Sequence, residues 1–185
     1  MKELAAATLA CVFLLPAPAG AGKKDSPASP ALTSEHWNAS KTLSFRTPAG
    51  WVVEAGTGQP EITEARGDDG LIVRLLYREG ELGLDTLHVE CMLVRLAGAM
   101  DTFPQVDYEY DFVGGAVGER RALDSAFVVH YDEPINGHRA WRQRNLTVVG
   151  EGESVCVVAY APLPVWKKSK PARNLLTSIV ESIRF

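Results

Sequence analysis

The chain contains four histidines, and two of them flank one predicted β-hairpin. They are His36, His88, His130 and His138. None shows the H-x-x-x-H spacing or the neighbouring cysteine ligand that zinc sites commonly use. His130 and His138 could face each other across the hairpin, with Asp132 and Glu133 nearby, and would then form a two-histidine, one-carboxylate site. This arrangement suggests a metal-dependent hydrolase as an alternative function, whereas ordinary surface histidines are the simpler interpretation.

Three acidic residues alternate with three aromatic residues along another predicted strand. The acidic residues are Asp107, Glu109 and Asp111, and the aromatic residues are Tyr108, Tyr110 and Phe112. Clustered carboxylates are the ligands that Ca²⁺ prefers. Side chains two residues apart on a strand nevertheless lie about 7 Å apart, too far to share one ion without loop ligands. We therefore interpret the acidic residues as a solvated strand face.

The sequence lacks the common motifs of nucleophilic catalysis and phosphate binding. No serine lies in a G-x-S-x-G turn, and Gly114-Gly115-x-x-Gly118 has neither the Lys nor the Ser/Thr of a phosphate-binding loop. Arg142 and Arg144 could line a shallow ligand groove, but pairing with charges on a neighbouring strand is the ordinary explanation. We therefore predict no catalytic, cofactor-binding or metal-ligating residue, and no cofactor.

The N-terminus has the features of a cleavable export signal. Leu4 to Leu15 are apolar apart from Thr8, and this run is too short for a membrane span, which needs about 20 apolar residues. Lys2 supplies a positive charge, and the small residues of 17–21 fit a cleavage site after Ala19 or Ala21. We expect a signal peptide over residues 1–21 and a periplasmic or secreted mature protein.

Cys11 raises the alternative of a lipid-modified lipoprotein. Thr8 stands where such proteins usually have leucine, and the apolar run continues beyond Cys11, so we expect this cysteine to be discarded with the signal peptide. No later segment is apolar enough to span a membrane, which predicts no stable membrane insertion after cleavage. Residues 22–35 offer little to bury and predict a flexible linker before a folded domain over residues 36–185.

Removal of the signal peptide would leave two cysteines, Cys91 and Cys156. In an oxidising compartment such a pair is a disulfide candidate. Cys156 lies in a predicted strand and Cys91 on the apolar stripe of a predicted helix, so a bond is feasible if their Cα atoms come within about 7 Å. Two separately buried free cysteines are the alternative.

Length and charge limit the domain count and the class of partner. The chain has 185 residues, of which 46% are hydrophobic and 23% charged, and its net charge is −4. These values are ordinary for one globular domain. Nucleic-acid binding draws on clustered Lys and Arg, so the negative charge argues against a nucleic-acid partner. The partner class that remains is an unknown protein or small molecule.

The pattern of apolar residues predicts an antiparallel sheet with two helices. Predicted strands cover 43–47, 51–55, 71–77, 106–112, 122–131, 139–149 and 155–161, and 61–65 could be a strand or a turn. We expect Pro48-Ala49-Gly50 to turn a hairpin, Gly114-Gly115 to end a strand, and Asn136-Gly137 to form a hairpin turn.

Two segments have helical spacing of apolar residues. Leu84 to Met100 is predicted as a helix, with a buried strand over Val89 to Leu96 as the competing interpretation. A second helix starts at Pro171, since proline suits the first helical turn. Strands in succession with helices near the ends indicate an α+β fold, in which one antiparallel sheet is covered by helices.

Both ends of this folded region carry a recognisable pattern. The first is Phe45-Arg46-Thr47-Pro48-Ala49-Gly50-Trp51, and the second runs from Leu175 to Phe185. The first is similar to the F-x-x-P-x-G-W entry, and the second resembles the L-x-x-I-x-x-S-x-x-F ending, of the PsbP-like superfamily, which includes PsbP, Mog-type and DcrB-like exported proteins. The resemblance implies an α/β/α sandwich with a central antiparallel sheet of about six strands. We expect Pro48 and Gly50 to shape the hairpin, Trp51 to fill the core and Phe185 to close the sheet edge.

Members of this superfamily mostly act as binding or assembly modules, so the resemblance implies an exported, non-enzymatic binding or assembly-support protein. None of its partner-binding residues can be placed on this sequence.

Overall fold

The structure is a computed structural model that describes residues 30–67, 69–80, 83–94, 105–117 and 119–185, without the side chains of 110–112. The predicted signal peptide and residues 22–29 of the predicted linker lie outside the described residues. The last linker residues, Ser34 and Glu35, belong to the first strand, because they pair with Thr47 and Arg46. For these two residues the linker prediction was wrong.

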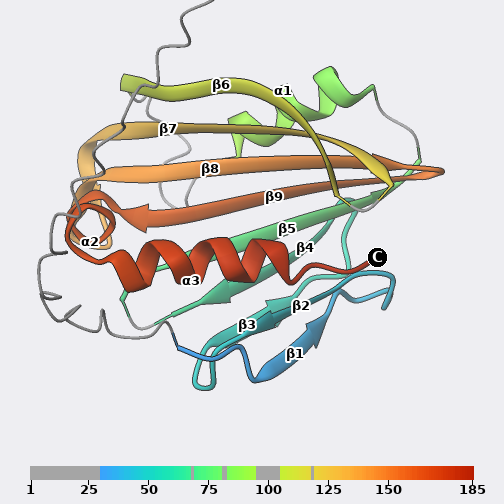
Figure 1. Cartoon of the computed structure of the whole chain (residues 1–185), viewed down its shortest axis with the longest axis horizontal. Coiled ribbons are helices and arrows are strands. Elements are labelled where there is room, and N and C mark those ends of the chain that lie inside the picture. The colour runs from blue at the N-terminus through green and yellow to red at the C-terminus, as the bar shows by residue number, and fades with distance from the viewer. Residues whose placement is uncertain (1–29, 68, 81–82, 95–104, 118) are drawn as a thin grey trace, which may run out of the picture.

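The main element is a seven-stranded antiparallel sheet with the strand order β3-β4-β5-β9-β8-β7-β6 (Figure 1). Its strands are β3 (Val52–Ala55), β4 (Glu61–Arg66), β5 (Ile72–Glu79), β6 (Gln105–Val117), β7 (Arg120–Ile135), β8 (His138–Gly150) and β9 (Glu153–Pro162). A second sheet pairs β1 (Ser34–Trp37) with β2 (Ser44–Thr47). The fold class is α+β as expected, but the main sheet has seven strands rather than about six.

The expected hairpin around Pro48 and Gly50 was wrong. β2 pairs with β1, whereas β3 pairs with β4, so the turn carries the chain from the small sheet to the main one. Gly50 is in the left-handed region, with φ +87°, which explains the glycine at this turn. Trp51 and Phe185 pack against the apolar core as expected, and the backbone of Arg184 pairs with Ser44 at the edge of the small sheet.

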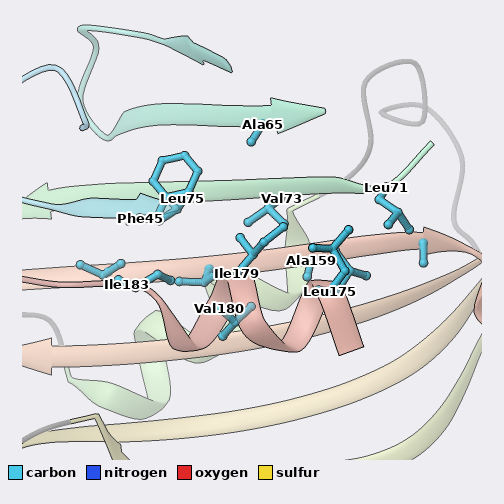
Figure 2. Packing of buried hydrophobic residues seen from close by; sticks show 14 of the residues in the cluster. Phe45, Ala65, Leu71, Val73, Leu75, Ala159, Leu175, Ile179, Val180 and Ile183 are labelled. Carbon is cyan, nitrogen blue, oxygen red and sulfur yellow. The ribbon is translucent and has the colours of Figure 1, made fainter. Parts of the chain in front are cut away.

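One face of the main sheet is covered by α3 (Lys170–Glu181), preceded by the short α2 (Leu163–Lys168), which sequence analysis missed. Ser169 caps α3 by accepting a hydrogen bond from the Ala172 amide at 3.1 Å, and Pro171 lies in the first turn. Leu175, Ile179 and Val180 of α3 pack with side chains of β2, β5 and β9 (Figure 2).

The opposite face carries α1 (Leu84–Leu93). The helical interpretation of this segment is confirmed over Leu84–Leu93, and residues 95–104 lie outside the described residues. α1 buries only Leu87, His88 and Cys91, which is little apolar area for a helix. With helices on both faces, the sheet forms an α/β/α sandwich (Figure 1).

A disulfide joins Cys91 of α1 to Cys156 of β9, with their Cα atoms 5.6 Å apart. Cys156 lies opposite Thr147 of β8 and Leu76 of β5 in the sheet register, so the bond attaches α1 over the middle of the sheet.

The long strands differ from expectation in two further places. β6 continues through Gly114 and Gly115 to Val117, because these residues pair with Leu123, Ala122 and Arg120 of β7. Register shifts between Tyr108 and Tyr110 and between Tyr110 and Val113 interrupt the alternation predicted for this strand. The Asn136-Gly137 turn is confirmed: both residues have positive φ, at 50° and 78°, as a type I′ turn requires.

Replacing Cys91 and Cys156 together by alanine is expected to lower the free energy of unfolding by about 2–5 kcal/mol. Because α1 has few apolar contacts, its amides should then exchange hydrogen faster than those of β7, β8 and β9. Chemical denaturation and hydrogen exchange measure the two effects. Unchanged exchange in α1 would show that the disulfide is not what holds this helix.

Candidate functional site

An open groove lies on the α3 face of the main sheet, beside α3. It has a volume of about 420 Å³. The lining comes from β6, β7, β8, the C-terminal end of α3 and Arg184 beyond it. It consists of Val113, Gly114, Gly115, Ala116, Val117, Ala122, Asp124, Arg144, Leu146, Val180, Glu181 and Arg184. Figure 1 shows α3 running roughly along the strands on the β9 and β5 side of the sheet, so this helix leaves the part of the face nearest β6 uncovered. We refer to this feature as the α3 groove.

A bidentate ion pair forms part of the floor of the α3 groove. Arg144 of β8 donates from Nε to both carboxylate oxygens of Asp124 at 3.1 Å, and from Nη2 to Oδ2 at 2.6 Å. Both side chains are about a quarter exposed. The fork geometry fixes both groups in place, so the floor offers a rigid polar surface, and Asp124 is occupied as an acceptor.

Arg142 is buried next to this floor and links three elements. Its guanidinium lies 4.7 Å from the centre of the Trp166 ring of α2. Its Nε is 2.6 Å from Oε2 of Glu109 on β6, and its Nη1 donates to the Gln143 carbonyl at 2.7 Å. Both interpretations of Arg142 and Arg144 thus apply in part: Arg144 lines a groove, and both arginines form cross-strand ion pairs.

The described acidic residues of β6 pair with side chains on β7 and on β8, the strand beyond it. Asp107 Oδ2 lies 3.0 Å from Nε2 of His130, and Glu109 pairs with Arg142. The Asp111 side chain lies outside the described residues. The predicted solvated face is confirmed for Asp107 and Glu109, which are 61% and 39% exposed, although Glu109 also pairs with the buried Arg142.

His130 and His138 are not opposite each other in the hairpin. The register pairs His130 with Ala140 and Ile135 with His138, with an irregularity between them. His138 instead contacts the edge of Trp141, with ring centres 5.8 Å apart. Among the described residues, the structure contains no group of three histidine, cysteine or acidic side chains arranged to hold a metal ion.

His88 is fully buried between α1 and the sheet, and the expectation of a surface histidine was wrong for it. Its Nδ1 lies 2.8 Å from the Thr147 hydroxyl of β8, and its Nε2 lies 2.8 Å from the Ser125 hydroxyl of β7. The sequence did indicate that His88 would be buried. His88 follows Leu87 and precedes Cys91 by three residues, so it falls on the same helical stripe.

A second, larger hollow of about 810 Å³ lies at the hairpin tips, between the start of α1 and residues 119–121 and 149–151. Its charged residues have both signs: Arg120 and Arg121 stand beside Glu119 and Glu151. This hollow lies at the ends of strands, whereas the α3 groove has a floor of three strands and a wall from α3, so we take the α3 groove as the candidate site.

His36 lies in β1, away from the α3 groove. Burial lowers the pKa of His36 below its ordinary value of 6.5, because it disfavours the charged ring. The Nε2 atom lies 2.8 Å from the Thr47 hydroxyl, and the ring centre lies 5.5 Å from that of Phe45.

Replacing His88 by alanine is expected to cost about 2–4 kcal/mol of stability, because it opens a cavity and leaves the Ser125 and Thr147 hydroxyls without this partner. Val89→Ala on the same helix is the matched control, since Val89 is 50% exposed and should change stability by less than about 0.5 kcal/mol. Equal effects of the two substitutions in urea denaturation would contradict the bridging role of His88.

The lowered pKa of His36 predicts that stability falls in mildly acidic solution. Between the folded pKa and 6.5 the unfolded chain binds more protons, so stability is complete above pH 6.5 and is lost as the pH falls through the folded pKa. His36→Gln should flatten this dependence. An NMR titration of the His36 ring gives the direct check, and a midpoint at or above 6.5 would be inconsistent with the prediction.

Comparisons with known proteins identify the fold. No family model matches this sequence, and no curated protein matches it. Among solved structures, the chain is similar to cyanobacterial PsbP (CyanoP) from Synechocystis sp. PCC 6803, determined in solution. The TM-score is 0.59 at 14% sequence identity, and the match covers 91% of this chain and 99% of that chain. At this identity the likeness concerns the fold alone, and the protein has a PsbP-like fold.

Proposed function

We propose that the protein is an exported, non-enzymatic binding or assembly-support module that binds its partner in the α3 groove. The observation that carries the proposal is the composition of this groove. Its described lining contains no serine, threonine, cysteine or histidine, so it lacks the side chains that most often act as nucleophiles. Carboxylates can act as general bases, but the exposed Glu181 has no such nucleophile beside it in this lining. The one aspartate of the lining, Asp124, accepts a bidentate ion pair from Arg144.

A rigid, open and partly apolar groove is suited to recognition. The ion pair between Asp124 and Arg144 fixes the floor, and Val113, Leu146 and Val180 add apolar surface around it. A preformed surface of this kind lowers the ordering cost of binding. The fold agrees with this assignment, because it is shared with a PsbP protein, although a fold by itself does not define a function.

Export is the second part of the proposal. The apolar N-terminal run and the small residues that follow it are typical of a signal peptide. The disulfide between Cys91 and Cys156 suits an oxidising compartment. No helix among the described residues has the length and apolar character needed to cross a bilayer. These observations support a periplasmic or secreted location.

The alternative is a metal-dependent hydrolase that uses His130 and His138, and it requires a different arrangement of residues. It needs the two histidines to approach one ion, whereas the register separates them along the hairpin. Stoichiometric zinc in the purified protein, lost on replacing either histidine, would favour this alternative.

Reversing a charge on the side of the α3 groove formed by α3 should weaken partner binding about tenfold or more. A tenfold loss corresponds to a contact worth about 1.4 kcal/mol. Glu181→Arg makes this change, because Glu181 lines the α3 groove and is exposed. Glu54→Arg is the matched control, since Glu54 is exposed on β3 at the far edge of the sheet.

The measurement begins with cross-linking in the exported fraction of the native cells, followed by identification of the captured protein. The affinity of each variant for that purified partner is then compared with that of the unaltered protein. If Glu181→Arg and Glu54→Arg bind equally well, the α3 groove is not the binding site. If no exported partner is captured, the assembly role is wrong.

A further inference from the structure

β6 is an exposed edge of the main sheet. It is the last strand in the order β3-β4-β5-β9-β8-β7-β6, and within the described part of the chain it pairs only with β7. Figure 1 shows it as the outermost strand, on the opposite side of the sheet from β3 and β4. A strand in this position presents unpaired backbone N–H and C=O groups along its free side.

The two halves of β6 differ in how well they could accept another strand. The first half carries Asp107 and Glu109 and contains both register shifts, at 108–110 and 110–113. Charges and bulges are the features by which natural edge strands discourage pairing. The second half, Val113–Val117, pairs with Asp124 to Arg120 in unbroken register.

The second half has none of these protective features. Its residues are Val113, Gly114, Gly115, Ala116 and Val117, with no charge and no proline. Val113 is 52% exposed, and a Cβ added at Gly114 or Gly115 would meet nothing within 4 Å. Both faces of the sheet are therefore open at these glycines, so the described residues place no side chain over them that would block an added strand.

The same five residues form one wall of the α3 groove. A strand added beside Val113–Val117 would project alternate side chains toward the α3 face, next to this hollow. The charged residues of the lining are balanced, with Asp124 and Glu181 against Arg144 and Arg184. A groove without net charge favours an uncharged side chain, since a charged one would lose hydration without a matching counter-charge.

We propose that Val113–Val117 binds an extended, uncharged segment of a partner protein by β-strand addition, with a large apolar side chain of that segment seated in the α3 groove. This inference rests on the proposed binding function and specifies the class of partner. Main-chain hydrogen bonds to β6 supply the affinity, and the side chain in the groove supplies the specificity.

A second copy of the same chain fits this site less well. Antiparallel pairing of Val113–Val117 with itself would place Gly115 opposite Gly115, and the incoming strand would bring only valine, glycine and alanine to the groove. Extending the pairing along the whole of Gln105–Val117 would centre it on Asp111 and oppose two acidic residues. Five pairs of small residues bury far less than the roughly 800 Å² per partner of a typical stable interface.

The test is a selection from a phage-displayed library of eight-residue peptides, in which apolar residues are allowed at alternate positions. The target is the purified protein, expressed from the full-length sequence. Val113→Lys serves as the counter-target, because a charge on a sheet edge opposes pairing. Val52→Lys is the matched control: Val52 is 58% exposed and lies on β3, the other edge strand. A thermal melt monitored by circular dichroism verifies that both variants are folded.

We expect enriched peptides that carry a large apolar side chain, and that bind the unaltered protein and Val52→Lys equally. Val113→Lys should bind them at least tenfold more weakly. N-methylation of alternate amides in a selected peptide should weaken binding by roughly 10- to 100-fold when the methylated face is the one turned to β6, because two or three hydrogen bonds are lost. Methylation of the other set of amides should have little effect.

Three results with the purified protein and the selected peptides would overturn the inference, and a fourth would come from a captured partner. These are enrichment that is no greater on the unaltered protein than on Val113→Lys, binding that survives both patterns of N-methylation, and a dimer in sedimentation that Val113→Lys dissociates. The last result would assign the edge to a second copy. A partner captured through the α3 groove but insensitive to Val113→Lys would refute strand addition and leave the proposed binding function in place.

Discussion

The width of the main sheet relative to its helices is the constraint on which the remaining structure depends. Seven strands must be covered, but α3 has 12 residues and α1 has 10. α3 runs roughly along the strands (Figure 1). A helix with its side chains is about 10–12 Å wide and neighbouring strands lie about 4.8 Å apart, so one helix covers only two or three of the seven strands. α3 lies over the β5–β9 region and buries the main apolar core there (Figures 1 and 2). The region of β6, β7 and β8 beside it becomes the α3 groove.

Polar interactions add to the apolar packing on both faces of this sheet. On the α3 face, Arg142 and Arg144 are paired with Glu109 and Asp124, so charges can lie next to the core. On the α1 face, His88 bridges hydroxyls on two strands, and a disulfide adds a covalent link. Such contacts are directional, and a buried polar group is costly when its partner is removed. They therefore fix the positions of the elements more strictly than apolar contacts of the same size.

Sequence patterns predicted most strands and helices well, but they predicted poorly which strands pair with one another. Alternation and turn residues identified β7, β8, β9 and the Asn136-Gly137 turn, because these are local signals. The partner of β2 was wrong, since local turn chemistry at Pro48 and Gly50 does not reveal which sheet the next strand joins. The α3 groove was foreseen only through Arg142 and Arg144, because a hollow between a helix and three strands depends on tertiary packing. The burial of His88 was overlooked although its helical spacing indicated it.

The disulfide also determines what happens when the chain is cut. Cys91 and Cys156 are 65 residues apart in sequence, and the segment between them contains all of β6, β7 and β8. These strands therefore belong to a covalent ring closed by the sulfur–sulfur bond. A protease that cleaves once within this ring, for instance at the exposed Asn136-Gly137 turn, produces two fragments that stay joined. In an oxidising compartment the protein can thus be nicked there and remain a single molecule, with its sheet pairing intact.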